Sequence, residues 1–168
     1  DLWEPPLYTA AATGNLPAAK MLVAAGAKVN RTTSRGRIPL TAAALWGDYN
    51  MAEFLLSAGA DPNIARDMTP LLLATCYPDN LWDNPIQEDI VELLLDHGAN
   101  PNQEYNLYDK GTHTALSCAV SKGNADVTRL LLKHGAEVNQ AALNAAGIPG
   151  RSLVKRLLDE ALAKARGS

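Results

Sequence analysis

The feature that most constrains the fold is a short string, Gly-Ala-x-x-Asn, that occurs four times along the chain. Its copies begin at Gly26, Gly59, Gly98 and Gly135, so successive copies lie 33, 39 and 37 residues apart. Each copy follows an apolar, mostly leucine-rich run, and each run follows a shorter segment that is rich in alanine. A two-part pattern that recurs at a period of about 20 to 50 residues indicates an array of similar structural units.

The local chemistry predicts two short helices in each unit. Thr69-Pro70-Leu71 is typical of a helix start, because threonine is a good N-cap and proline fits the first turn. A glycine ends this first helix, as at Gly47, since glycine readily takes the left-handed conformation of a helix C-terminus. A second, amphipathic helix follows, for example over residues 50–57, and the glycine of the repeated string ends it. A helix pair this short buries its apolar face only when copies stack.

Taken together, these features resemble the ankyrin repeat, with its Thr-Pro-Leu start, alanine-rich core, leucine-rich second helix and β-turn finger. The resemblance extends from about residue 3 to about residue 158. It implies an all-α solenoid of stacked helix-turn-helix units with short β-hairpin-like fingers. We expect a single domain with repeats at approximately 3–35, 36–66, 67–111 and 112–140, followed by C-terminal capping helices at 141–165.

The chain departs from the family pattern at the helix starts. In the family, the Thr-Pro-Leu motif that begins the first helix is often followed by histidine. The matching positions here hold Tyr8, Thr41, Leu72 and Ser117. Pro5 and Ile38 stand where the threonine N-cap belongs in the first two repeats. Because a lost N-cap costs about 0.5 to 2 kcal/mol, we expect these two repeats to be less stable than the third and fourth.

The period also breaks in length. Pro70 to Gly98 spans 28 residues where the first two repeats have 20, which places eight extra residues between the helices of the third repeat. These residues, 78–85, include two prolines and four Asp or Asn residues, and they predict an ordered loop. The finger at 103–113 is also longer than the others. The capping helix from residue 152 is expected to turn Leu153, among other apolar residues, inward.

Composition excludes several classes of protein. The chain has 168 residues, 47% of them hydrophobic, which is ample for one folded core and argues against disorder. Its net charge of −3 argues against a dedicated nucleic-acid binder. No apolar run approaches the roughly 20 residues that cross a membrane. With only two cysteines, a disulfide-stapled scaffold is excluded. We expect an intracellular, cytoplasmic monomer.

Reactive side chains do not form a convincing catalytic or metal-binding set. Cys118 and His113 are conceivable as a nucleophilic pair, but cysteines near a core, here Cys76 and Cys118, are far more often small packed thiols. His97 and His134 occupy equivalent places one repeat apart, too far apart to share a metal ion without further ligands. Phosphate-loop and metal-site motifs are absent from the sequence. We therefore expect no enzyme activity, no cofactor and no metal.

Aromatic residues point to a binding surface instead. Trp46 and Tyr77 hold equivalent positions at the ends of successive first helices, Trp82 lies in the extra loop, and Tyr105 and Tyr108 lie in the long finger. Such residues are not needed to pack a stack of Ala and Leu, and exposed Trp, Tyr and Arg dominate binding hot spots. An alternative for Trp82 is that it folds back on Trp46 or Tyr77 and pins its own loop.

In ankyrin-like proteins the finger tips and the inner face of the first helices usually form a concave contact surface. The resemblance assigns the following residues to that surface: Arg35, Arg37, Leu45, Trp46, Tyr77, Trp82, Tyr105, Tyr108 and Lys122. We expect a protein–protein interaction module, as a targeting or scaffold part of a larger protein, and the arginines suit a partner with an acidic segment. The alternative is an enzyme or small-molecule site between the loop 78–85 and the finger 103–113.

Overall fold

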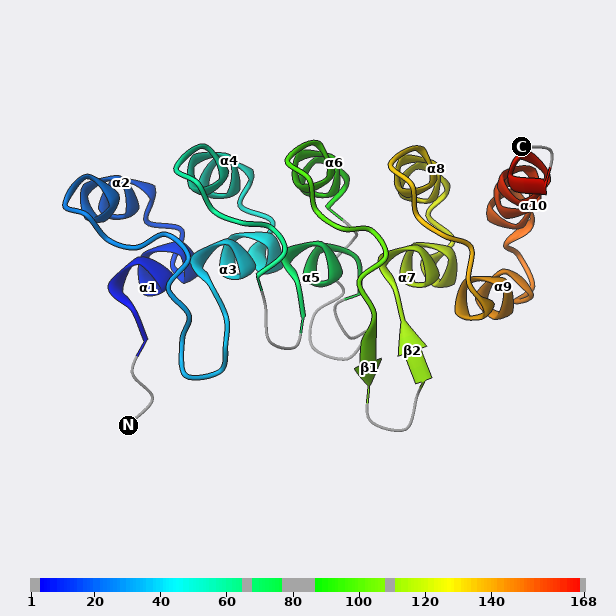
Figure 1. Cartoon of the computed structure of the whole chain (residues 1–168), viewed down its shortest axis with the longest axis horizontal. Helices are drawn as coiled ribbons and strands as arrows, with labels where there is room; N and C mark the ends of the chain where they lie inside the picture. The colour runs from blue at the N-terminus through cyan, green and yellow to red at the C-terminus, as the bar shows by residue number, and fades with distance from the viewer. Residues whose placement is uncertain (1–3, 65–67, 77–86, 108–110, 167–168) are drawn as a thin grey trace.

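The computed structural model describes residues 4–64, 68–76, 87–107 and 111–166. Within these residues the chain forms ten helices and one two-stranded hairpin, which confirms the all-α repeat solenoid. Figure 1 shows the helices in two parallel rows, with the fingers extending from the inner row. The inner row consists of α1 (Pro6–Ala12), α3 (Pro39–Trp46), α5 (Pro70–Cys76), α7 (Ala115–Lys122) and α9 (Gln140–Ala146). The outer row consists of α2 (Leu16–Ala24), α4 (Tyr49–Ser57), α6 (Glu88–Asp96), α8 (Ala125–Lys133) and α10 (Ser152–Arg166).

The helix starts follow the sequence chemistry. Thr69 accepts a hydrogen bond from the Leu72 N–H at 3.3 Å. Thr114 and Ser117 form a reciprocal capping box at the start of α7, so the serine in the usual histidine position takes over a capping role. Pro5 and Ile38 make no side-chain cap at α1 and α3, in agreement with the sequence.

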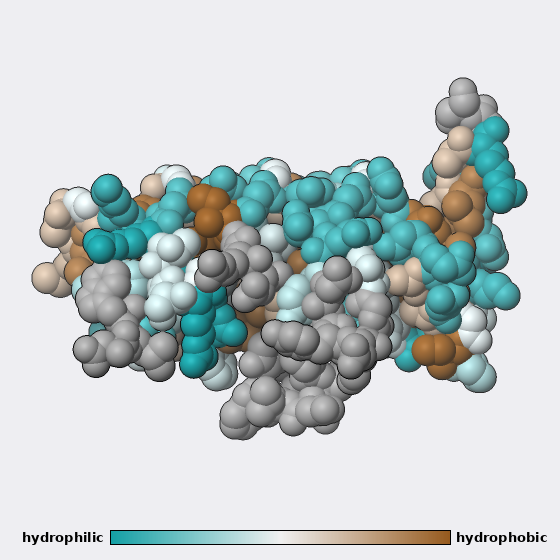
Figure 2. Space-filling model, turned by 60° about the horizontal axis from the view of Figure 1, so that its bottom comes forward, coloured by the Kyte–Doolittle hydropathy of each residue, from teal (hydrophilic) through white to brown (hydrophobic). Residues whose placement is uncertain are grey.

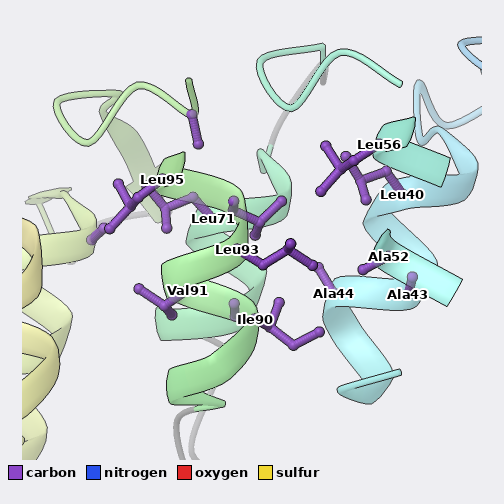
Figure 3. Close-up of a cluster of buried hydrophobic side chains, with 14 of the residues drawn as sticks. Leu40, Ala43, Ala44, Ala52, Leu56, Leu71, Ile90, Val91, Leu93 and Leu95 are labelled. Atoms are coloured by element: carbon purple, nitrogen blue, oxygen red, sulfur yellow. The ribbon is translucent and has the colours of Figure 1, made fainter. Parts of the chain in front are cut away.

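Most residues of the central inner helices α3, α5 and α7 are buried. All seven residues of α5 and the first six of α3 lie in the core, and Ala42, Ala43 and Ala44 are at most 1% exposed. Small side chains here allow neighbouring inner helices to approach closely. Figure 3 shows how side chains from the second and third repeats, including Ala44, Ile90 and Leu93, fill the space between the two layers.

Each outer helix contributes one stripe of side chains to this core. Leu55, Leu94 and Leu131 hold equivalent positions in α4, α6 and α8, and each is fully buried. The buried stripe of the C-terminal capping helix α10 is narrower than expected. Val154 and Leu158 are buried, whereas Leu153 is 44% exposed. The prediction that Leu153 points inward is therefore wrong, because this residue in the first turn of α10 lies outside the stripe that packs on the core.

The recurrent asparagines join each repeat to the next. The Asn63 amide group donates to the Gly98 carbonyl at 3.0 Å, and its carbonyl oxygen accepts from the Asn100 N–H at 2.7 Å. Asn30 and Asn102 make the same pair of bonds to the repeats that follow them. The constant spacing within the string thus reflects a ladder of side-chain bonds along the stack.

The two cysteines require a correction. The sequence favours Cys76 and Cys118 as separate packed thiols, whereas the structure joins them in a disulfide with their Cα atoms 5.2 Å apart. Both are buried, at 8% and 9% exposure. They lie on α5 and α7, adjacent helices of the inner row, although the extra loop and the long finger separate them by 42 residues in the sequence.

Candidate protein-interaction surface

The C-terminal end of α3 carries the most exposed aromatic side chain among the described residues. Pro39 to Ala44 are buried, Leu45 is half-buried, and Trp46 is 56% exposed. The change occurs within the last turn of the helix, so the core of the repeat is complete before Trp46 is reached. More than half of the Trp46 surface therefore remains uncovered by the stack.

Gly47 fixes the backbone directly after Trp46. It ends α3 in the left-handed conformation, with φ of 69°. A Cβ atom at this position would lie 2.7 Å from the Gln87 side chain, which comes from the N-cap of α6 in the next repeat. The absence of a side chain at residue 47 therefore leaves room for the Gln87 side chain of the next repeat beside the turn that follows Trp46.

The first finger presents arginines from a tight turn. Thr33 is buried, and its carbonyl accepts from the Gly36 N–H at 2.9 Å while its N–H donates to the Arg37 carbonyl at 2.8 Å. The Thr33 hydroxyl also accepts from the Arg37 N–H at 3.1 Å. These bonds close a turn with Arg35 exposed near its tip and Arg37 half-buried at its base. The pair places two positive charges on one hydrogen-bonded turn.

The long finger, between the third and fourth repeats, contains a two-stranded antiparallel hairpin. Its strands, β1 (Tyr105–Leu107) and β2 (Gly111–His113), pair Tyr105 with His113 and Leu107 with Gly111. Tyr105 is half-buried because it packs against a small apolar cluster formed by Leu72 and the two cysteines. Tyr105 thus has both an anchored and an accessible side.

The structure places the described contact residues on four separate parts of the inner row and its fingers. Arg35 and Arg37 share the first finger, Leu45 and Trp46 share the end of α3, and Tyr105 lies on the hairpin that precedes α7. Lys122, the last residue of α7, is exposed like Trp46 in the matching position. The remaining three predictions, Tyr77, Trp82 and Tyr108, fall outside the described residues, as does the loop 78–85.

The described part of the face that carries the fingers is mainly hydrophilic. In Figure 2 the described atoms of this face are mostly teal and white, with hydrophobic colour in isolated patches and along the projecting α10. The exposed large apolar side chains of the described residues include Met21 on α2 and Tyr49 on α4, which belong to the outer row. Among the described residues of the inner row, Trp46 is the large exposed aromatic.

Among the described residues, the cysteines and histidines that the sequence singles out lie in separate environments. Cys118 has no thiol to act as a nucleophile, because it is half of a disulfide. The His97 Nδ1 lies 2.9 Å from the Leu93 carbonyl, and the His134 Nε2 lies 3.7 Å from an Asp96 carboxylate oxygen. Within the described ranges, no group of three or more His, Cys, Asp or Glu side chains is placed to hold a metal ion.

Hollows in the surface occur among the outer helices. One of about 340 Å³ lies between α4 and α6, one of about 270 Å³ between α6 and α8, and one of about 560 Å³ between α8 and α10. Their linings include neither the exposed arginines of the first finger nor Trp46 nor Tyr105. The described contact residues Arg35, Trp46 and Tyr105 therefore line none of these three hollows.

Comparison with known proteins identifies the class. The profile of the family described as "Ankyrin repeats (3 copies)" matches residues 3–67, 65–142 and 82–165, and the chain belongs to this family. A solved ankyrin repeat domain from Acinetobacter baumannii aligns with a TM-score of 0.70 and 32% identity, covering 82% of this chain and 67% of that one.

Two curated relatives match this chain over only part of their own length. A putative ankyrin repeat-containing protein of Treponema pallidum is 37% identical over 106 residues, which cover 61% of this chain and 33% of the relative. Protein phosphatase 1 regulatory subunit 27 of Mus musculus is 37% identical over 88 residues, which cover 52% of this chain and 53% of the relative. The matched regions therefore span between about a third and a half of these relatives. Among the described helices, none combines the length and the apolar composition that a membrane span requires.

Proposed function

We propose that this chain binds another protein through the surface formed by the inner-helix ends and the fingers. Ankyrin repeats are generally protein–protein interaction modules. The observation that carries the proposal is Trp46, which is 56% exposed at the end of a helix whose preceding turns are buried. A tryptophan that the fold leaves uncovered, on a helix fixed by its neighbours, is a preformed anchor for a partner.

The free energy that a partner would gain by covering Trp46 supports a contact role for this residue. A tryptophan side chain buries about 150 to 250 Å². Covering the 56% that is exposed here would remove roughly 85 to 140 Å² from water, which is worth about 2 to 3.5 kcal/mol at 25 cal/mol per Å². That range is the size of a binding hot spot. Because Trp46 is held at the last turn of α3, little further ordering is needed on binding.

The charges of the first finger suggest the chemistry of the partner. Arg35 is exposed and Arg37 half-buried on a turn that Thr33 closes. Arginine binds a carboxylate with two parallel hydrogen bonds. Because two arginines are held on one turn, they favour an acidic segment over a single acidic residue. We infer that the partner places an acidic segment near the first finger and an apolar side chain on Trp46.

The test is site-specific photocrosslinking in native cells. A photoreactive amino acid at position 46 should yield a discrete crosslinked protein. The same amino acid at position 21 is a matched control, because Met21 is 73% exposed but lies on the outer helix α2. A crosslink that forms equally well at both positions, or only at position 21, would overturn the proposed surface.

A further inference from the structure

The disulfide lies at the base of the long finger. Cys76, the last residue of α5, and Cys118, on α7, form a small apolar cluster with Leu72, and Met68 and Tyr105 pack against it. This cluster is separate from the main core that runs through the stack. The chain contains only two cysteines, and both are used here.

The disulfide therefore links two inner helices and supports one residue of the candidate surface, Tyr105. It ties the end of α5, where the extra residues begin, to α7, and Tyr105 of β1 rests against it. The Cys76 sulfur also lies 3.6 Å from the Thr114 carbonyl, at the end of the finger where α7 begins. Tyr105 has an apolar support only while α5 and α7 stay together.

We propose that Cys76–Cys118 is a structural disulfide that holds the Tyr105 finger in place, and that this protein works in an oxidising compartment. What the proposal says about binding, namely the compartment and the redox form in which the surface meets its partner, rests on the interaction surface proposed above, whereas the disulfide itself does not. Formation of the bond is a two-electron oxidation. One cysteine thiolate attacks a disulfide oxidant, either a protein or a small molecule, and expels one of the oxidant's sulfurs as a thiolate. The second cysteine thiolate then attacks the mixed disulfide and expels the other sulfur. The two protons lost by the cysteines end on these two leaving thiolates, so one oxidant disulfide is reduced to two thiols.

Position and burial favour a lasting bond over a transient one. Structural disulfides resist reduction, whereas exposed ones are labile or regulatory. Both cysteines here are buried, at 8% and 9% exposure. Their Cα separation of 5.2 Å lies within the usual range of about 4.4 to 6.8 Å for a disulfide. Such bonds persist in secreted, periplasmic and cell-surface proteins and are rare in the cytosol. The expectation of a cytoplasmic location rests on missing motifs, and the disulfide argues the other way.

The first experiment reads the redox state directly. Native cells are quenched in acid, the full protein is alkylated under denaturing conditions before or after reduction, and the peptides that contain Cys76 and Cys118 are measured by mass spectrometry. We expect both cysteines to be unalkylated before reduction and alkylated afterwards. Alkylation of both cysteines without prior reduction would overturn the proposal, since the protein would then carry two thiols where it works.

The second experiment tests the support of the finger. Hydrogen exchange is compared between the oxidised protein and the Cys76→Ser/Cys118→Ser variant, and also between oxidised and reduced wild type in case the variant folds poorly. Loss of the bond should raise exchange in β1, β2 and the ends of α5 and α7, while α2 and α4 serve as internal controls. Closing a loop of this length should also raise the thermal midpoint by roughly 8 to 16 °C.

Uniform or unchanged exchange would mean that the disulfide does not support the finger and would overturn that part of the proposal. Failure of the crosslink at position 46 is a separate outcome. A protein with an intact disulfide and a protected hairpin but no crosslink would contradict the interaction surface and leave the disulfide assignment standing. A crosslink in a protein with two free thiols would do the reverse.

Discussion

Leu94→Ala tests whether adjacent repeats share one core. Leu94 is fully buried in α6, at a position equivalent to Leu131 in α8. The change removes three carbon atoms, worth about 0.8 kcal/mol each in transfer free energy. The cavity left between the layers adds to this loss, so the free energy of unfolding should fall by about 2 to 5 kcal/mol. In a stack where each repeat contacts only its neighbours, a loss at this interface affects two repeats together.

The measurement is urea unfolding followed by far-UV circular dichroism, with the free energy taken from the midpoint and the slope. Leu153→Ala is the matched control, because the same atoms are removed from a side chain that is 44% exposed. We expect the control to cost well under half as much. If Leu94→Ala shifts the midpoint no further than Leu153→Ala does, the inter-repeat packing described for α6 is wrong.

Two further predictions concern the contacts that link repeats. Asn63→Ala removes two hydrogen bonds to the following repeat, to Gly98 and Asn100. It should lower the free energy of unfolding by about 1 to 3 kcal/mol. Equal stability of wild type and variant in urea would contradict the ladder of asparagine bonds. Gly47→Ala should lower the free energy of unfolding more than Gly123→Ala does. Both glycines have positive φ, which alone costs an alanine roughly 1 to 2 kcal/mol, but only at Gly47 would the added Cβ atom lie within 3 Å of the Gln87 side chain. Equal losses in urea unfolding would show that Gln87 moves aside freely.

The fold could be predicted from the sequence because its signals are local and repeated. The four Gly-Ala-x-x-Asn strings fix where the second helices end, and Pro39 and Pro70 fix where two of the first helices begin. Each copy reinforces the others, so an error in one unit would break the register of the next. The ladder bonds of Asn30, Asn63 and Asn102 provide that register with a physical basis.

Features that depend on pairing between repeats are harder to predict. The disulfide was missed because Cys76 and Cys118 occupy different turns of equivalent helices, and their contact depends on how α5 and α7 lie beside each other. The Gln87 contact with Gly47 depends on the path of the chain after the third repeat's extra residues. Tyr8, in the histidine position of the first repeat, is buried, although most aromatic residues are expected to avoid the core.

The candidate site could be predicted only in part for a related reason. Sequence register is enough to place Trp46 and Lys122 at the exposed ends of first helices. Tyr105 required the structure, because its support comes from Leu72 and the disulfide of neighbouring helices rather than from its own finger. Register assigns a residue to a face but does not show what packs beneath it.

Trp46 is proposed to serve binding and not folding, and one variant tests both halves of that claim. Once crosslinking at position 46 has identified the partner, affinity by calorimetry and unfolding in urea are measured on wild type and Trp46→Ala. We expect affinity to weaken by about 2 kcal/mol or more, which is roughly 30-fold, with the unfolding free energy changed by less than about 0.5 kcal/mol. Lost stability with unchanged affinity would contradict the account, because Trp46 would then be a packing residue and the proposed surface would have no anchor.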